Sequence, residues 1–134
     1  MEEKFNRATT QRPQGDRTID ASLVTIDLPS FIKQIKEEKS WSENDRNTIT
    51  VFKTNGMRIV LIALHEGAEM IKHVAKGLIS VQVLEGKLHF NTDEESIELS
   101  KGQMLALHEG ISHSVLAKEE TIFLLTLTTK LVEE

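Results

Sequence analysis

The chain contains no cysteine, and this absence excludes several kinds of chemistry at once. Without thiols there is no disulfide framework, no thiolate-bound metal and no cysteine nucleophile. Tyrosine is also missing, and aromatic residues make up only 4% of the sequence. Aromatic platforms that stack on nucleic-acid bases or on sugars are therefore not expected. Nothing in this composition requires an oxidising compartment.

A strong charge of one sign and long apolar runs are absent as well. The formal net charge is -5 over 134 residues, and acidic and basic residues are interspersed. This balance gives no electrostatic footprint for nucleic acid or for an anionic membrane surface. No apolar run approaches the roughly 20 residues of a membrane span, and the first residues lack the apolar segment of a signal peptide. We therefore expect a cytoplasmic protein with no nucleic-acid partner and no membrane partner.

The sequence divides into three regions of different character. Residues 1–20 are polar and show no periodicity, which predicts a flexible N-terminal tail. Residues 21–46 are expected to form a short strand around 24–28 and then a helix that begins at Pro29, where the first turn of a helix tolerates proline. Residues 47–130 are expected to form a single barrel domain, since a chain of this length supports one hydrophobic core.

From residue 48 onward the sequence is a succession of short apolar segments separated by turn residues. The first two segments flank Asn55-Gly56, a pair suited to a tight hairpin turn. Nine short strands with no helical pattern between them predict an all-β sandwich or barrel. The predicted strands are 48–54, 57–64, 68–74, 78–84, 87–90, 96–99, 103–107, 112–117 and 121–127.

The pentapeptide ALHEG occurs twice, at 63–67 and 106–110, and each copy is followed by a further histidine, His73 or His113. Strict strand alternation places His73 on the same face as Glu69, Ile71 and Ala75, opposite Lys72. Because Lys72 must face water, His73 is expected to face inward, and the same reasoning places His113 inward. Two inward histidines on separate strands could meet across a barrel.

The spacing of these residues resembles the two sequence motifs of the cupin superfamily, whose members are small jelly-roll β-barrels. The resemblance runs from about Thr48 to Thr129 and implies an all-β, RmlC-like cupin jelly-roll β-barrel. The one short N-terminal helix is predicted separately, by the pattern that begins at Pro29. Six positions match the motifs at fixed spacing: Gly67, His73, Gly86, Gly102, Gly110 and His113.

The same resemblance implies a metal site that is degenerate in this chain. In metal-bearing cupins two histidines and a glutamate of the first motif and a histidine of the second hold the ion. This sequence has His73 and His113 at two of these positions, and Ala75 and Ile79 at the other two. Catalytic zinc and iron sites ordinarily use three protein ligands, so two neutral imidazoles should hold a divalent ion weakly. We expect no cofactor or, if there is one, a single divalent metal (Fe, Mn, Ni or Zn) at His73 and His113.

The other histidines are interpreted as having no catalytic role. His65 and His108, inside the repeat, stand just before Glu-Gly at strand ends and are interpreted as turn residues. His89 is expected to face solvent, because Leu88 and Phe90 occupy the apolar face of its strand.

Two functions of different classes stay open. The first is a small-ligand-binding barrel without a complete metal centre. The second is a metal-dependent enzyme of oxygenase or isomerase type that uses His73, His113 and an unidentified third ligand. The sequence does not identify a catalytic residue for it. The first hypothesis predicts an apolar pocket lined by His73, Ala75, Ile79, Val81, His113, Val115, Phe123 and Leu125.

A third possibility is that the fold serves as an assembly module. Three apolar side chains, Met70, Val74 and Leu84, are expected to face outward and would leave apolar surface on a monomer. The sequence therefore predicts a homodimer, in which the strand around 24–28 pairs with the edge of a partner's sheet.

Overall fold

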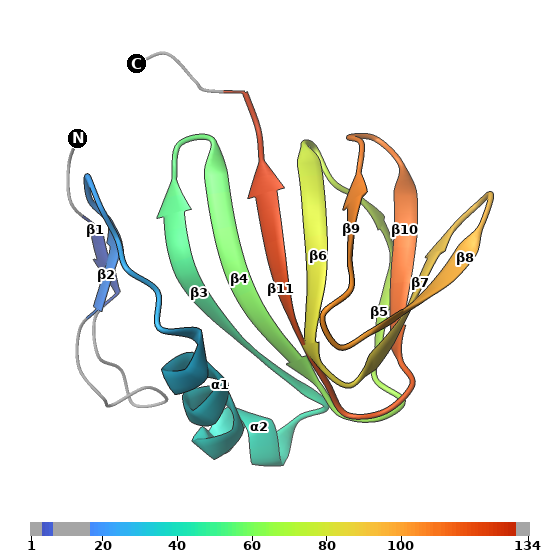
Figure 1. Cartoon of the computed structure of the whole chain (residues 1–134), viewed down its shortest axis with the longest axis horizontal. Coiled ribbons are helices and arrows are strands. Elements are labelled where there is room, and N and C mark those ends of the chain that lie inside the picture. The colour runs from blue at the N-terminus through green and yellow to red at the C-terminus, as the bar shows by residue number, and fades with distance from the viewer. Residues whose placement is uncertain (1–3, 7–16, 131–134) are drawn as a thin grey trace.

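The computed structural model describes residues 4–6 and 17–130 (Figure 1). No helix within these residues is long and apolar enough to cross a membrane. The elements in chain order are β1 (Lys4–Asn6), β2 (Arg17–Asp20), α1 (Leu28–Glu37), α2 (Lys39–Glu43), β3 (Arg46–Thr54), β4 (Met57–Leu64), β5 (Glu69–Val74), β6 (Leu78–Glu85), β7 (Lys87–Thr92), β8 (Ser96–Ser100), β9 (Met104–Leu107), β10 (Ser112–Ala117) and β11 (Thr121–Thr128).

Two antiparallel sheets make up the barrel. One has the strand order β3-β4-β11-β6-β9 and the other the order β5-β10-β7-β8 (Figure 1). Strands that are distant in sequence are neighbours in both sheets, because the chain crosses repeatedly from one sheet to the other, as in a jelly roll. The prediction of an all-β jelly-roll barrel is confirmed, and each of the nine predicted strands is present as one of β3 to β11.

The main hydrophobic core lies between the two sheets. Alternate residues of β6 point into it, because side chains of a strand alternate between its two faces: Ile79, Val81 and Val83 are buried and are separated by half-buried residues. Phe90 of β7 and Phe123 of β11 belong to the same cluster of buried residues. The middle of the barrel is thus filled by side chains from both sheets.

A second core lies between the helices and the outer face of the five-stranded sheet. Ile35 of α1 and Trp41 of α2 pack there against Ile49, Leu61 and Ile122 of the sheet. The inner and outer faces of β4 are therefore both buried along its second half. The helix that the sequence predicts is present and is followed at once by a second short one.

Helix α1 begins one residue before its predicted start. Asp27 caps it, since one carboxylate oxygen accepts a hydrogen bond of 3.3 Å from the backbone N–H of Ser30 and the other accepts one of 2.7 Å from the Ser30 hydroxyl. Pro29 lies in the first turn, where its missing N–H costs no hydrogen bond.

Two predictions for the N-terminal region are wrong. Residues 4–6 and 17–20, assigned to the tail, form the antiparallel strands β1 and β2, and Arg17 donates a hydrogen bond to the carbonyl oxygen of Thr50 in β3. Residues 24–28 do not form a strand, because Ile26 contributes to the core beneath the helices without any strand pairing and Leu28 already belongs to α1. The remainder of the predicted tail, residues 1–3 and 7–16, lies outside the described residues.

Candidate functional site

His73 of β5 and His113 of β10 lie side by side. They are opposite each other in the ladder between the two strands, and their ring centroids are 4.3 Å apart with the planes inclined by 61°. His113 is buried, with 4% of its surface exposed, whereas His73 is exposed at the edge of the sheet. The structure therefore brings the two motif histidines together as an asymmetric pair.

A β-bulge in β5 decides which side chains share the face of His73. His73 is opposite His113, but Met70 is opposite Val115, so three steps along β5 match two along β10. The bulge lets both Met70 and His73 point toward the barrel, and it leaves Ile71 80% exposed. The predictions that Met70 faces outward and that Ile71 shares the face of His73 are wrong, because strict alternation fails across a bulge.

The two rings have the same hydrogen-bonding arrangement. Nδ1 of His73 lies 2.9 Å from the carbonyl oxygen of Ile71, and Nδ1 of His113 lies 3.0 Å from that of Ile111. A carbonyl oxygen only accepts, so each Nδ1 carries the hydrogen and donates it. In the neutral rings both Nε2 atoms therefore keep a lone pair that can accept a hydrogen bond or bind a metal.

The buried ring of the pair resists protonation. The pKa of His113 lies below its ordinary value of 6.5, chiefly because burial disfavours the charged imidazolium. The hydrogen bond to Ile111 opposes this shift, and the neighbouring His73 adds to it. At neutral pH His113 is thus a neutral hydrogen-bond acceptor in the barrel wall.

We expect this burial to make stability depend on pH through His113. Between the unfolded pKa near 6.5 and the lower folded pKa, the unfolded chain binds more protons than the folded one. The free energy of unfolding therefore keeps its full His113 contribution above pH 6.5 and loses it as the pH falls through that window. Thermal unfolding over the acid range should show a steeper loss for the wild type than for His113→Gln. A His108→Gln control, at an exposed histidine, should keep the wild-type dependence.

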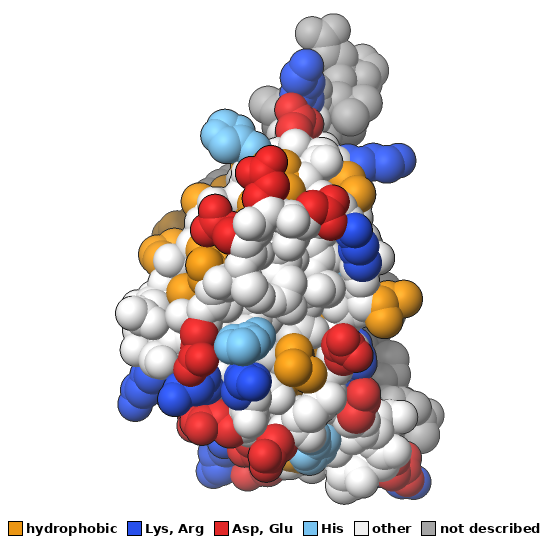
Figure 2. Space-filling view, turned by 90° about the vertical axis from the view of Figure 1, so that its right-hand side faces the viewer, with side chains coloured by type: hydrophobic (Ala, Val, Ile, Leu, Met, Phe, Trp, Pro, Cys, Tyr) orange, Lys and Arg blue, Asp and Glu red, His pale blue; other side chains and the backbone are white. Residues whose placement is uncertain are grey.

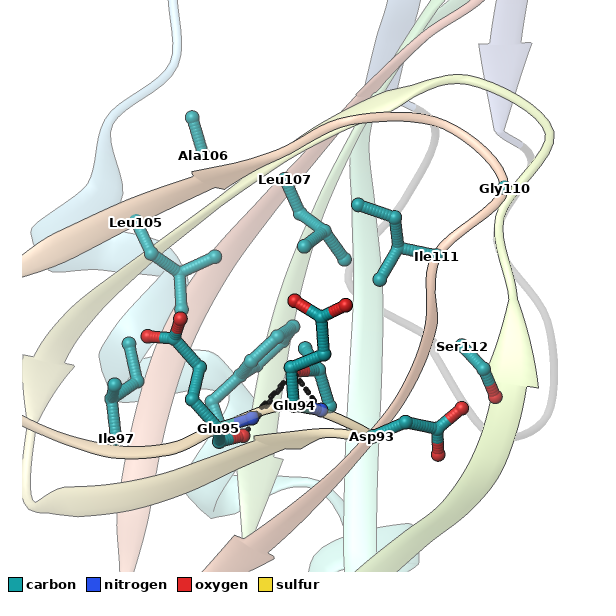
Figure 3. Close-up of a pocket in the computed structure, with 12 residues that line it drawn as sticks. Asp93, Glu94, Glu95, Ile97, Leu105, Ala106, Leu107, Gly110, Ile111 and Ser112 are labelled. Atoms are coloured by element: carbon teal, nitrogen blue, oxygen red, sulfur yellow. Dashed lines mark hydrogen bonds between the residues drawn. The ribbon is translucent and has the colours of Figure 1, made fainter.

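A cavity of about 490 Å³ opens beside the histidine pair, between the β7–β8 hairpin, β9 and the loop that leads into β10 (Figure 3). Its apolar wall is formed by Phe90, Ile97, Leu105, Leu107 and Ile111. Its remaining lining residues are polar, acidic or small: Thr92, Asp93, Glu94, Glu95, Ala106, Gly110 and Ser112.

Phe90 joins this cavity to the histidine pair. Its ring lines the cavity and also stacks on His113, with the centroids 5.2 Å apart and the planes inclined by 11°. Ile111, whose carbonyl oxygen holds Nδ1 of His113, lines the cavity too. A molecule in the cavity would thus touch the residues that hold His113 in place.

Comparison with known proteins bears on the fold. No protein-family model matches the sequence, and no curated protein is significantly similar to it. Among solved structures, a conserved protein of unknown function from Streptococcus pyogenes is 21% identical, with a TM-score of 0.65 over 85% of this chain and 94% of that one. A cupin superfamily protein from Desulfitobacterium hafniense is 16% identical, with a TM-score of 0.64 over 95% and 99% of the two chains.

A third similar structure is the cupin domain of Cnp3 from Schizosaccharomyces pombe. It is 17% identical to this chain, with a TM-score of 0.64 over 97% of this chain and 89% of that one. This chain has the cupin fold. The resemblance inferred from six glycine and histidine positions is therefore confirmed at the level of the fold.

The side chains of this cupin barrel do not fit a complete metal centre of the kind found in the superfamily. Among the described residues, no three His, Cys, Asp or Glu side chains are close enough to hold an ion. Ala75 and Ile79, at the other two motif positions, have no ligand atoms in their side chains. Within residues 4–6 and 17–130 the donor set is the pair His73 and His113, one ligand fewer than a catalytic zinc or facial-triad iron site ordinarily uses.

Most of the residues predicted to line a pocket belong instead to the filled part of the barrel. Four of them, Ile79, Val81, Val115 and Phe123, are buried in the cupin core, and Ala75 and Leu125 pack against it. None of the eight lines the cavity of Figure 3. The middle of the barrel is filled because side chains from both sheets meet there, and the cavity lies toward the β7–β8 hairpin.

Sequence reasoning missed the residues that do line the cavity. Leu105 and Leu107 alternate on β9 just before the second ALHEG histidine, and Ile111 follows that repeat directly. The alternation of the two leucines was a usable signal for an inward face. Nothing in the sequence showed that this face borders a cavity and not a filled core.

The remaining histidines lie away from the cavity. His65 stacks on Trp41 with centroids 3.4 Å apart, and its Nε2 donates a hydrogen bond of 2.8 Å to the Trp41 carbonyl oxygen. His108 is exposed in the loop after β9, and His89 lies 3.2 Å from a carboxylate oxygen of Glu98 on the outer face of its sheet. His65 therefore fixes the end of β4 against α2, in addition to its place in the turn.

Proposed function

We propose that this cupin-fold protein binds a small molecule in the cavity beside the histidine pair, without a complete metal centre. The observation that carries the proposal is the cavity itself. Its volume of about 490 Å³ is in the range of small-molecule sites, roughly 300–1,000 Å³, and its wall is mainly apolar with polar groups at the edge. This combination suits a ligand with an apolar body and few polar groups.

The side chains of the cavity wall offer a ligand both apolar and polar contacts. Phe90 borders the cavity and is held in place by the stack on His113. Leu105 and Leu107 of β9 line the cavity as well, and Ser112 offers a hydroxyl group. Burial of a ligand's apolar surface against these side chains supplies the binding energy, at roughly 25 cal/mol per Å² removed from water.

The test is a screen of small molecules by NMR, with chemical shifts assigned to the lining residues. Ile111, 40% exposed at the mouth of the cavity, allows a blocking variant. Because Ile111→Trp fills the entrance, it should weaken the binding of any hit roughly tenfold or more. Ile71→Trp, at an exposed isoleucine outside the lining, is the matched control and should leave affinity unchanged. Hits whose affinity both variants leave unchanged would contradict the proposal.

The alternative is a metal-dependent enzyme of oxygenase or isomerase type. One observation favours it: both Nδ1 atoms donate to backbone carbonyls, an arrangement that orients the Nε2 atoms of metal-binding histidines in proteins. The same screen should therefore include elemental analysis of protein purified without a histidine tag. Near-stoichiometric Fe, Mn, Ni or Zn that is lost in His73→Ala would overturn the proposal of a metal-free site.

The homodimer stays a prediction, but the apolar side chains that the structure exposes differ from the three that the sequence led us to expect. Met70 packs against the barrel core and Leu84 against the core beneath the helices, so of the three expected side chains only Val74 is exposed, at 54%. Residues 24–28 do not form the strand that was to pair with a partner.

A further inference from the structure

The tip of the β7–β8 hairpin carries three consecutive acidic residues, and all three line the cavity. Figure 3 shows the carboxylates of Glu94 and Glu95 pointing across the cavity toward the apolar side chains of β9 and of Ile111. Figure 2, which looks onto this side of the molecule, shows acidic side chains on the upper part of the face with hydrophobic side chains beside them, and further acidic side chains mixed with basic ones on the lower part. Negative charge is thus placed directly over the apolar wall.

The charge at this rim is only partly balanced within the chain. Lys72 of β5 donates a hydrogen bond of 2.6 Å to Asp93 and so pairs with that carboxylate. The lining contains no lysine and no arginine. Within the described part of the chain, Glu94 and Glu95 form no ion pair, so two negative charges remain available at the cavity.

The backbone of the hairpin tip, from which both side chains extend, is closed by its own hydrogen bonds. The N–H groups of Glu94 and Glu95 donate to the hydroxyl oxygen of Thr92, at 3.3 and 3.1 Å. The N–H of Thr92 in turn donates to the carbonyl oxygen of Glu95 at 2.8 Å. Figure 3 shows this turn as the base from which both side chains extend. A turn closed by its own hydrogen bonds loses less entropy when a ligand binds to it.

We infer that the cavity takes an organic cation, namely a protonated primary amine attached to an apolar body. This inference rests on the proposed function and names the class of ligand. The apolar body would lie against Phe90 and Leu107, and the ammonium group would donate hydrogen bonds to Glu94 and Glu95. An ammonium–carboxylate hydrogen bond is stronger than a neutral one. Anionic ligands are disfavoured by the same two charges.

The chemistry of the rim also selects among cations. A quaternary ammonium has no N–H to donate, and proteins recognise it with cages of several aromatic rings. Phe90 is the single aromatic residue in the lining, so such a cage is missing here. A primary amine uses the acceptors that are present.

Three probes of similar size test the inference: 2-phenylethylamine, 2-phenylethanol and 3-phenylpropanoate. Binding to the wild-type chain is measured by titration calorimetry, and the site is identified from NMR shifts of the lining residues. At low salt the amine should bind about tenfold more tightly than the alcohol, and the carboxylate should bind most weakly. The preference should shrink at about 0.3 M salt, because exposed carboxylates are screened.

The double variant Glu94→Gln/Glu95→Gln removes the charge and keeps the shape of the side chains. It should lower the affinity for the amine about tenfold and leave that for the alcohol unchanged. The matched control, Glu37→Gln/Glu66→Gln, removes the same charge at exposed positions outside the lining and should change neither affinity. An equal fall in amine affinity in this control variant would show that only the net charge of the protein matters, and that result would overturn the inference.

The failures of this inference and of the proposed function differ in what is observed. If the alcohol binds in the cavity as tightly as the amine, the inference is wrong while the proposed function stands. If none of the three probes shifts the lining residues, the proposed function fails and the inference fails with it.

Discussion

Gly86→Ala is expected to lower the free energy of unfolding by roughly 3 kcal/mol or more, a large share of the roughly 5–15 kcal/mol that stabilises a typical domain. Gly86 joins β6 to β7 with φ of +90°, a conformation that costs a residue with a side chain about 1 kcal/mol or more. A Cβ atom there would also lie 2.2 Å from the carbonyl oxygen of Glu120 and 2.7 Å from the Cα of Thr121. Backbone would have to move to make room.

The segment that would have to move, residues 120–121, is joined to the β6–β7 turn by hydrogen bonds. The N–H of Lys87 donates to the hydroxyl oxygen of Thr121 at 3.0 Å, so the β6–β7 turn and the start of β11 cannot separate without losing that bond. The cost of the substitution is therefore the strain at Gly86 together with the lost contact.

Gly102→Ala separates these two contributions. Gly102 has φ of +87°, nearly the same as Gly86, but no heavy atom lies within 4 Å of a Cβ placed there. We expect it to cost only about 1 kcal/mol, from backbone strain alone. Urea denaturation of both variants gives the comparison. Equal losses would show that the close approach to residues 120 and 121 has no energetic importance.

Phe90→Ala is expected to lower the free energy of unfolding by about 3–5 kcal/mol. The ring is 3% exposed, belongs to the barrel core and stacks on His113. Its removal leaves a void between the core and the cavity, since neighbouring strands hold the backbone and allow only partial collapse. Ligand binding should weaken as well, because the ring forms part of the cavity wall.

Two variants serve as controls for Phe90. Phe90→Leu keeps much of the apolar volume and should recover more than half of the lost stability. Phe52→Ala, at a half-buried phenylalanine of β3 that belongs to neither core cluster, should cost less than Phe90→Ala. Denaturation curves in urea give all three values. A loss below about 1 kcal/mol for Phe90→Ala would contradict its place in the core.

The barrel could be predicted because its strands leave a local record in the sequence. Short apolar segments with turn residues between them mark all nine strands of the barrel. The motif glycines at 67, 86, 102 and 110 each have a positive φ, which explains why glycine is needed at those spacings. These features depend on neighbours along the chain, and so a sequence reading detects them.

The candidate site was less predictable because it depends on contacts between distant segments. The bulge in β5 arises from the match between two strands some forty positions apart, and it reverses the faces of Met70 and Ile71. The meeting of His73 and His113 followed from the motif spacing. The cavity did not, since whether Leu105 and Leu107 face a filled core or an open space depends on how the two sheets close around them.

The unequal covering of the two sheets has a consequence for motion. Helices cover the outer face of the five-stranded sheet, whereas β5 is largely exposed and β8 ends its sheet with only one strand partner. Local opening costs least where few apolar contacts are lost, so β5, β8 and the tip of the β7–β8 hairpin should exchange amide hydrogens well before β4. The sheet that carries the acidic tip should therefore open locally more often than the helix-covered sheet. Such opening would let a molecule enter the cavity while the helix-covered sheet stays closed.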